Sequence, residues 1–191
     1  MDTLLIVAFT IILILIYIIV WRNNVSYVIN RNDNKEYLVK NLPDKESASE
    51  LLGLIYENLN KLINHLHNNI QKYPEQKDYI KLLWDRTRKI TISENHNNAS
   101  QYTTYTVNKG EEIVFCLRDE NGNLHDVNLL LFVAIHELAH VACPELNHTQ
   151  LFISIFVFLL KTAISLGVYK YQDYNKNPVN YCGMYLNQSP L

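Results

Sequence analysis

The stretch "AIHELAHVACPELNHTQLF", residues 134–152, decides how the chain is interpreted. It places His136 and His140 four residues apart around Glu137, and a third histidine, His148, follows Pro144. Residues four apart in a helix lie on the same face, so both imidazoles can reach one metal ion. The stretch is therefore either a metal site or a buried helix that happens to carry histidines.

The surroundings of the motif favour a metal. Its neighbours are apolar, and unpaired histidines would be costly to bury among them. His136 and His140 supply two corners of a tetrahedral zinc site, and Pro144 ends the helix so that His148 can return as the third ligand. We predict one zinc ion per chain. Other candidates for the third position are Glu145, Asp173 and, as a soft ligand, Cys143.

Glu137 has a different role in this interpretation. It lies about 100° round the helix from His136, so it is poorly placed as a ligand but can reach a water on the metal. A general base at this point can take a proton from a zinc-activated water as that water attacks a peptide carbonyl. The motif therefore predicts a zinc-dependent peptidase with Glu137 as its catalytic base.

The N-terminus carries the run "TLLIVAFTIILILIYIIVW", residues 3–21, which has no charged side chain. As a helix it covers about 28 Å, close to the hydrocarbon thickness of a bilayer. We expect a transmembrane anchor at 1–22, a polar linker at 23–43 and a metallopeptidase-like domain at 44–191. Basic residues follow the span, so the positive-inside rule predicts a single-pass protein with a cytosolic domain, in a host-cell or virion membrane.

Charge and cysteine content limit the partners and the compartment. The formal net charge is −2 across 191 residues, which gives no electrostatic reason to expect nucleic-acid binding. The three cysteines are odd in number and widely spaced. This pattern is not a disulfide framework, and it predicts a reducing compartment.

Periodicity predicts a mixed α+β domain. Apolar residues recur at helical spacing from Asp44 to about Tyr73, and Pro74 can open a second helix. "QYTTYTV" and "EIVFCL", residues 101–107 and 112–117, predict a β-hairpin. Two apolar helices follow, at 124–142 with Asp126 or Asn128 as the cap and from 148 to about Gly167.

The motif resembles that of the WLM-type zinc metallopeptidases, in particular the variants encoded by large nucleocytoplasmic DNA viruses. The resemblance rests on residues 136–152 with "TVNKGEEIVFCLRDENGNLHDVNLLLFVAI" before them and "NYCGMYLNQSP" after them, and it spans about 45–190. It implies a zincin-like minimal domain, with an active-site helix packed on a small sheet plus further helices. It also implies His136, His140 and His148 as zinc ligands and Glu137 as the base.

The resemblance further suggests how a protein or peptide substrate binds. In peptidases of this kind an extended substrate pairs with a sheet edge beside the active-site helix, and we expect that edge at Ile113–Leu117. Tyr181 and Tyr185 are candidate donors to the oxyanion. The chain has no basic tail, so the DNA-bound substrates of cellular relatives are not transferred to it.

A second hypothesis is a non-catalytic, zinc-stabilised structural membrane protein, for example one of a virion. A structural zinc site normally has four protein ligands, and Cys143 or Cys182 would be the fourth. Only the peptidase needs Glu137. A buried helix without metal is the third alternative.

Overall fold

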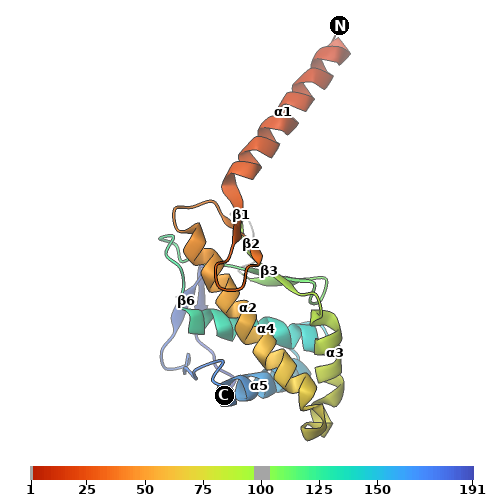
Figure 1. Ribbon diagram of the computed structural model, residues 1–191, viewed down its shortest axis with the longest axis vertical. Coiled ribbons are helices and arrows are strands. Elements are labelled where there is room, and N and C mark those ends of the chain that lie inside the picture. The colour runs from red at the N-terminus through yellow and green to blue at the C-terminus, as the bar shows by residue number, and fades with distance from the viewer. Residues whose placement is uncertain (1, 97–103) are drawn as a thin grey trace.

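The computed structural model describes residues 2–96 and 104–191, apart from the side chains of residues 2, 4 and 20–23. An N-terminal helix, α1 (Asp2–Asn24), points away from a body of helices and short strands (Figure 1). The other elements, in chain order, are β1 (Val25–Ile29), β2 (Glu36–Lys40), α2 (Lys45–Asn68), the 3-10 turns η1 (Ile70–Lys72) and η2 (Pro74–Gln76), α3 (Lys77–Thr87), β3 (Thr91–Glu94), β4 (Tyr105–Val107), β5 (Glu112–Phe115), α4 (Val127–Ala142), α5 (Gln150–Ser165), β6 (Val179–Tyr181) and β7 (Met184–Leu186).

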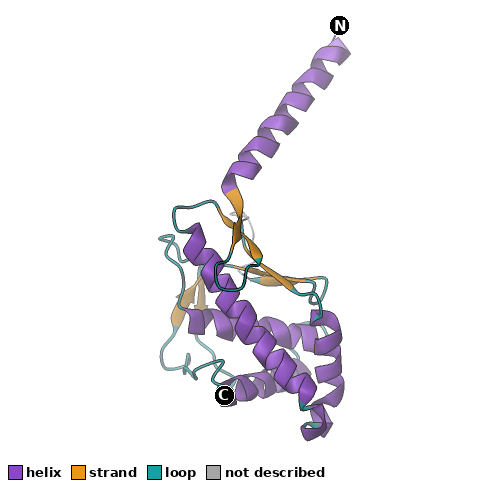
Figure 2. Ribbon diagram, viewed as in Figure 1, coloured by secondary structure: helices purple, strands orange, loops and turns teal. Residues whose placement is uncertain are grey.

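Helix α4 forms the centre of the body. It packs against α2, α3, α5 and β4, so it is covered on most sides (Figure 2). This explains why its sequence is apolar almost throughout, whereas α2 buries only one stripe of leucines and isoleucines. The predicted helices and the α+β class are confirmed. Asp126 is the cap of α4, since its carboxylate accepts hydrogen bonds from the N–H groups of Asn128 and Leu129.

The sheet beside α4 has the strand order β3-β5-β4. β5 pairs in parallel with β3 and antiparallel with β4, so the predicted hairpin is confirmed from residue 104 onward, while 101–103 lie outside the described residues. The expectation that Ile113–Leu117 offers a free edge is wrong, because β5 is the middle strand. Among the described strands, β4 is the edge next to α4.

Residues 23–43 do not form the polar linker suggested by their composition. β1 and β2 pair antiparallel over their whole length and pack on α2. The reason is the alternation in β2, where Tyr37 and Val39 point inward and are buried, while Glu36 is exposed and Leu38 and Lys40 are half-buried. The folded body therefore begins at Val25 instead of Asp44.

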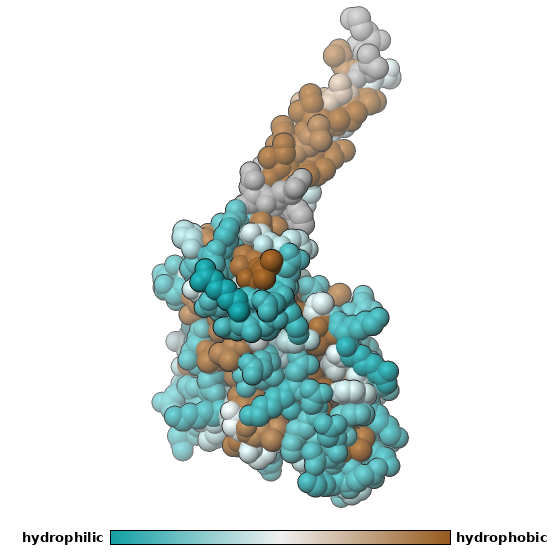
Figure 3. Space-filling view, in the orientation of Figure 1, coloured by the Kyte–Doolittle hydropathy of each residue, from teal (hydrophilic) through white to brown (hydrophobic). Residues whose placement is uncertain are grey.

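Helix α1 carries a run of exposed apolar side chains, including Phe9, Ile12 and Leu15, and its visible face is largely hydrophobic (Figure 3). Within the described part of the chain, however, we find no helix that is both long and apolar enough to cross a membrane. The predicted transmembrane helix at 3–21 is therefore not supported.

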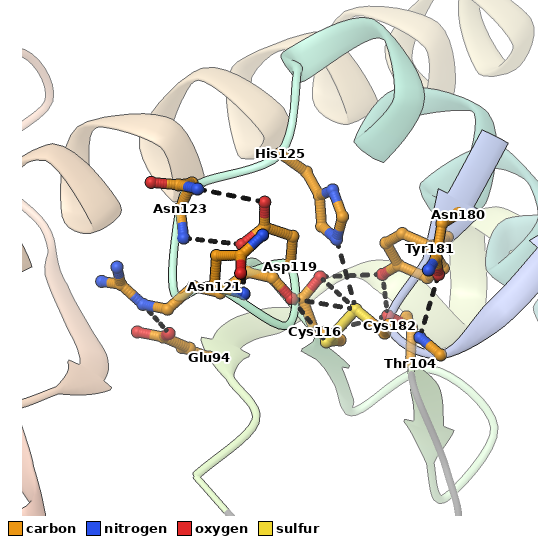
Figure 4. The surroundings of a disulfide bond; sticks show 12 residues. Glu94, Thr104, Cys116, Asp119, Asn121, Asn123, His125, Asn180, Tyr181 and Cys182 are labelled. Carbon is orange, nitrogen blue, oxygen red and sulfur yellow. Dashed lines mark hydrogen bonds and ion pairs between the residues drawn. A yellow bond between two sulfur atoms is a disulfide. The ribbon is translucent and has the colours of Figure 1, made fainter.

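A disulfide joins Cys116, just after β5, to Cys182, in the turn between β6 and β7 (Figure 4). The prediction of cysteines without a disulfide is wrong. The two partners are 66 residues apart in sequence, and a third cysteine, Cys143, is free and buried in the core. Spacing alone gave no sign of the pairing because the fold, not the local sequence, brings the two cysteines together.

Candidate metal centre

The three histidines of the motif are held by the ends of two helices. His136 and His140 lie on the last two turns of α4, which ends at Ala142 just before Pro144. After a short loop, Thr149 caps α5 by accepting a hydrogen bond from the N–H of Phe152. His148 therefore sits immediately before a fixed helix start, and the loop brings it back over α4.

The Nε2 atoms of the three histidines converge on one point. They lie 3.2 Å apart for His136 and His140, 3.2 Å for His140 and His148, and 3.0 Å for His148 and His136. Zinc–nitrogen bonds of about 2.0–2.1 Å at tetrahedral angles place ligand nitrogens roughly 3.3 Å apart. The residues present therefore fit three corners of a tetrahedral zinc site.

Hydrogen bonding alone does not account for this arrangement. A neutral imidazole nitrogen either donates or accepts, so three Nε2 atoms cannot all be satisfied by one another. Burial, together with the neighbouring His140 and His148, lowers the pKa of His136 to about 3. Burial and His148 lower the pKa of His140 to about 4. Both rings are thus neutral at pH 7, which is the form that binds a cation.

Two phenylalanine rings pack against the histidine rings and restrain them. Phe152 stacks on His140 with ring centroids 4.2 Å apart and meets the edges of His136 and His148. Phe156 packs against His136 at 5.2 Å. Both phenylalanines come from α5, so the helix that follows His148 also restrains the two ligands on α4.

Glu137 lies beside this centre and is 8% exposed. Its Oε2 accepts a hydrogen bond of 2.7 Å from the hydroxyl of Thr106 on β4. Burial raises the pKa of Glu137 to about 7, and the Thr106 hydrogen bond works against that rise. A carboxyl group whose pKa lies near neutrality can exchange a proton readily at physiological pH.

A cavity of about 620 Å³ opens over the histidines and Glu137. One wall is formed by α4 and the loop before α5, and the other by β4 and the β6–β7 hairpin. The residues that line it are Thr104, Tyr105, Thr106, Lys109, Phe132, Val133, His136, Glu137, His140, Glu145, Leu146, Asn147, His148, Tyr181, Met184 and Leu186.

The alternative ligands lie apart from the histidine cluster. Within the described residues, the one group of potential ligand side chains close enough to share an ion consists of His136, His140 and His148. Glu145 lines the cavity, but its Oε2 accepts a hydrogen bond from Thr149. Asp173 forms an ion pair with Lys176.

The two candidate oxyanion donors lie in different environments. Tyr181 borders the cavity, but it is 1% exposed and its hydroxyl donates to the Cys116 carbonyl at 2.9 Å while also contacting the Thr104 hydroxyl (Figure 4). Burial raises its pKa above the usual value. Tyr185 is 71% exposed and is not part of the cavity lining. These contacts do not support either residue as the donor.

Sequence reasoning missed several residues of this site. Thr106, Met184 and Leu186 enter it through strand pairing and the disulfide, which leave no local signal. Phe152 was available from the sequence, because it lies four residues after His148 at the start of a helix, where it can face back toward the ligand.

The chain is similar to viral proteins, and to one of them over most of its length. It is 46% identical to the uncharacterized protein R325 of Acanthamoeba polyphaga mimivirus over 171 residues, which is 89% of this chain and 86% of that protein. The chain belongs to the R325 family. The uncharacterized protein 136R of Invertebrate iridescent virus 6 is 47% identical over 83 residues, covering 41% of this chain and 44% of 136R. No family model matches.

The R325 family fold also occurs in a solved structure. A mutant of Wss1 from Saccharomyces cerevisiae superimposes with a TM-score of 0.50, covering 65% of this chain and 84% of that one. The sequences are 18% identical. This likeness shows the fold alone, and it agrees with the α+β class predicted from the sequence.

Proposed function

We propose that this protein is a zinc-dependent peptidase. The observation that carries the proposal is the convergence of three Nε2 atoms at 3.0–3.2 Å beside a buried glutamate in an open cavity. The fold likeness to Wss1, a WLM-type zinc metallopeptidase, supports it, since this is the family that the motif resembles. The substrate class is protein or peptide, and the viral relatives support a viral setting.

Each residue of the site has a role in hydrolysis. His136, His140 and His148 would hold the zinc ion, and a zinc ion bound there would act as a Lewis acid that lowers the pKa of a water to about 7. Glu137 takes the proton of the attacking water on its carboxylate and passes it to the leaving amine. Its Oε2 is already bonded to Thr106, so we assign the proton to Oε1.

Two observations weigh against a purely structural zinc. The fourth ligand of that hypothesis would come from Cys182 or Cys143. Cys182 is bonded to Cys116, and Cys143 is buried in the core outside the cavity lining. A site with three protein ligands and a cavity over the fourth position is the arrangement of catalytic zinc.

The substrate backbone has a candidate partner in β4. Its residues Tyr105 and Thr106 line the cavity, and β4 pairs with β5 on its other side. An extended peptide can add to such an edge as a further strand, with main-chain hydrogen bonds that do not depend on the peptide's sequence. This would place the scissile bond alongside Glu137.

Attachment to lipid is a second part of the proposal. The exposed apolar side chains of α1, among them Ile12 and Leu15, are unfavourable in water, and a bilayer is the surface that would cover a helix exposed on every side. A disulfide such as Cys116–Cys182 persists in oxidising surroundings, which argues against the cytosolic side expected from the basic residues after α1.

The peptidase proposal is tested with the full chain in detergent, loaded with zinc and incubated with a peptide library. Glu137→Gln keeps the size of the side chain but cannot accept the proton, so cleavage should fall by about 10²–10⁴-fold. Zinc content and melting temperature should stay near those of the wild type, because Glu137 is not a ligand. A wild type that holds zinc but cleaves nothing in the library would overturn the proposal.

Lipid attachment is tested by flotation of the full chain with phosphatidylcholine vesicles. The wild type should float with the vesicles. The double variant Ile11→Asp/Ile14→Asp should stay at the bottom of the gradient, because each aspartate opposes burial of α1 in hydrocarbon. Flotation of both proteins, or of neither, contradicts attachment through α1.

A further inference from the structure

We propose that Thr106 is a positioning residue that orients Glu137, an inference that rests on the proposed function. The Thr106 hydroxyl donates to Oε2 of Glu137 at 2.7 Å. Thr106 lies on β4, 31 residues before Glu137 in the sequence, so this contact joins the edge strand of the sheet to the helix that bears the metal ligands.

The contact restrains a group that is otherwise free to turn. The last torsion of a glutamate side chain has a broad minimum, so packing alone leaves the plane of the carboxylate poorly defined. A hydrogen bond to one oxygen fixes that plane and directs the other oxygen. The donor is itself held, because threonine is branched at Cβ and a strand restricts its χ1. Thr106 therefore fixes where Oε1 of Glu137 points.

The strand that carries Thr106 is also fixed at its start. Thr104, two residues earlier, accepts a hydrogen bond of 3.0 Å from the N–H of Cys116 and contacts the hydroxyl of Tyr181. Tyr181 in turn donates to the carbonyl of Cys116, which is disulfide-bonded to Cys182 (Figure 4). These contacts thus connect three elements: the end of β5, the start of β4 and the β6–β7 turn.

This arrangement links substrate binding to the base. Thr104, Tyr105 and Thr106 all line the cavity, so a peptide that pairs with β4 contacts the strand that orients Glu137. The orientation of the base, Glu137, and the binding of the substrate then both depend on strand β4. A defect at Thr106 should appear in the catalytic step rather than in substrate affinity.

The kinetic experiment uses the zinc-loaded full chain with a cleaved peptide. Thr106→Val keeps the shape and suits a strand but has no hydroxyl, so kcat should fall by about 10–100-fold, the cost of misplacing a reacting group. KM should stay within about 2-fold of the wild type. Thr106→Ser restores the hydroxyl and should recover most of kcat, which a purely structural role would not predict.

A matched control is Thr91→Val on β3. Thr91 also donates its hydroxyl within the sheet, to the carbonyl of Glu111 at 3.2 Å, but it lies outside the cavity. The same substitution there should leave kcat and KM unchanged. A fall in kcat for Thr91→Val equal to that for Thr106→Val would overturn the inference, because it would show a general effect on the sheet.

A second measurement does not depend on activity. Glutamate labelled with ¹³C at Cδ gives a carboxyl resonance for Glu137, assigned by its loss in Glu137→Gln. Thr106→Val should shift this resonance, and Thr106→Ser and Thr91→Val should not. An unshifted resonance in Thr106→Val overturns the inference. If the wild type cleaves nothing, the proposed function and this role both fail. If it cleaves and Thr106→Val has a wild-type kcat, only this role fails.

Discussion

The two walls of the cavity are built in different ways. The histidine wall comes from one continuous stretch, residues 134–152, in which a helix, a loop and a helix cap place all three ligands. The facing wall combines β4 with the β6–β7 hairpin, whose sequences lie more than seventy residues apart, and it depends on the Cys116–Cys182 bond and the hydrogen bonds of Tyr181. The metal ligands can be predicted from the sequence because they belong to one short motif. The facing wall of the cavity cannot, because its residues are distant in the sequence.

The largest effect is expected when a zinc ligand is removed from the histidine wall, because this tests the role of that wall alone. His148→Ala should weaken zinc binding by more than about 100-fold, since changes to groups that merely support a ligand already cost about 10–100-fold. Zinc at 100 times its Kd should stabilise the wild type by about 2.7 kcal/mol and the variant hardly at all. Thermal unfolding with and without zinc, together with elemental analysis, measures both effects.

The control for this prediction is Asn147→Gly, at the residue beside His148 in the same loop, because glycine keeps the left-handed backbone of this position (φ 65°). Asn147 lines the cavity and has no nitrogen in the cluster, so zinc binding should remain. Wild-type zinc affinity in His148→Ala would show that this histidine is not a ligand and would reopen the position to Glu145.

Removing the disulfide of the second wall should have the opposite effect: the protein should lose stability but keep its zinc. Cys182→Ser removes a bond between residues 66 apart, and the chain-entropy relation assigns a loop of that length about 4 kcal/mol. Urea unfolding under non-reducing conditions should show this loss of stability, while one zinc per chain is retained. We expect the zinc to be retained because all three ligands belong to the other wall.

A double variant provides the control for the disulfide. Cys116→Ser/Cys182→Ser breaks the same single bond, so its stability should match that of Cys182→Ser rather than fall twice as far. Loss of zinc from Cys182→Ser at temperatures where the protein stays folded would show that zinc binding also depends on the facing wall, contrary to this prediction.

A smaller effect is expected at the cap of α4. The Asp126 carboxylate accepts two backbone hydrogen bonds at the helix start, so Asp126→Ala should lower the free energy of unfolding by about 1 kcal/mol. Asp126→Asn keeps an acceptor and should lose less. Zinc affinity should be unchanged in both, because the histidines lie at the far end of the helix. Equal losses in the two variants would mean that the cap is not the cause.

The smallest effect is expected for Tyr185→Phe. Tyr185 is largely exposed on β7, and surface substitutions of this kind usually change stability by less than about 0.5 kcal/mol. Peptide cleavage should stay within about 2-fold of the wild type. A fall of 10-fold or more in kcat at unchanged stability would instead restore Tyr185 as an oxyanion donor and bring β7 into the active site.

The sequence predicted the helices, the hairpin and the α+β class because each has a periodic signal of its own. The helix around His136 and its cap, expected at Asp126 or Asn128, are examples, since both depend on contacts within four residues. The β1–β2 hairpin was mistaken for a linker because the polar turn between its strands dominates the composition, and Tyr37 and Val39 are its two buried strand residues. Thr106 could not be found at all, since nothing in the sequence indicates which strand faces Glu137.

The Cys116–Cys182 bond also closes the chain into a covalent ring. Both helices of the motif, and with them His136, His140 and His148, lie inside that ring. A single cut by any protease between residues 116 and 182, including one made by a second copy of this chain, would leave two pieces that remain joined. Such a nicked protein would migrate as an intact chain on a gel until a thiol is added, so maturation by internal cleavage would be visible only after reduction.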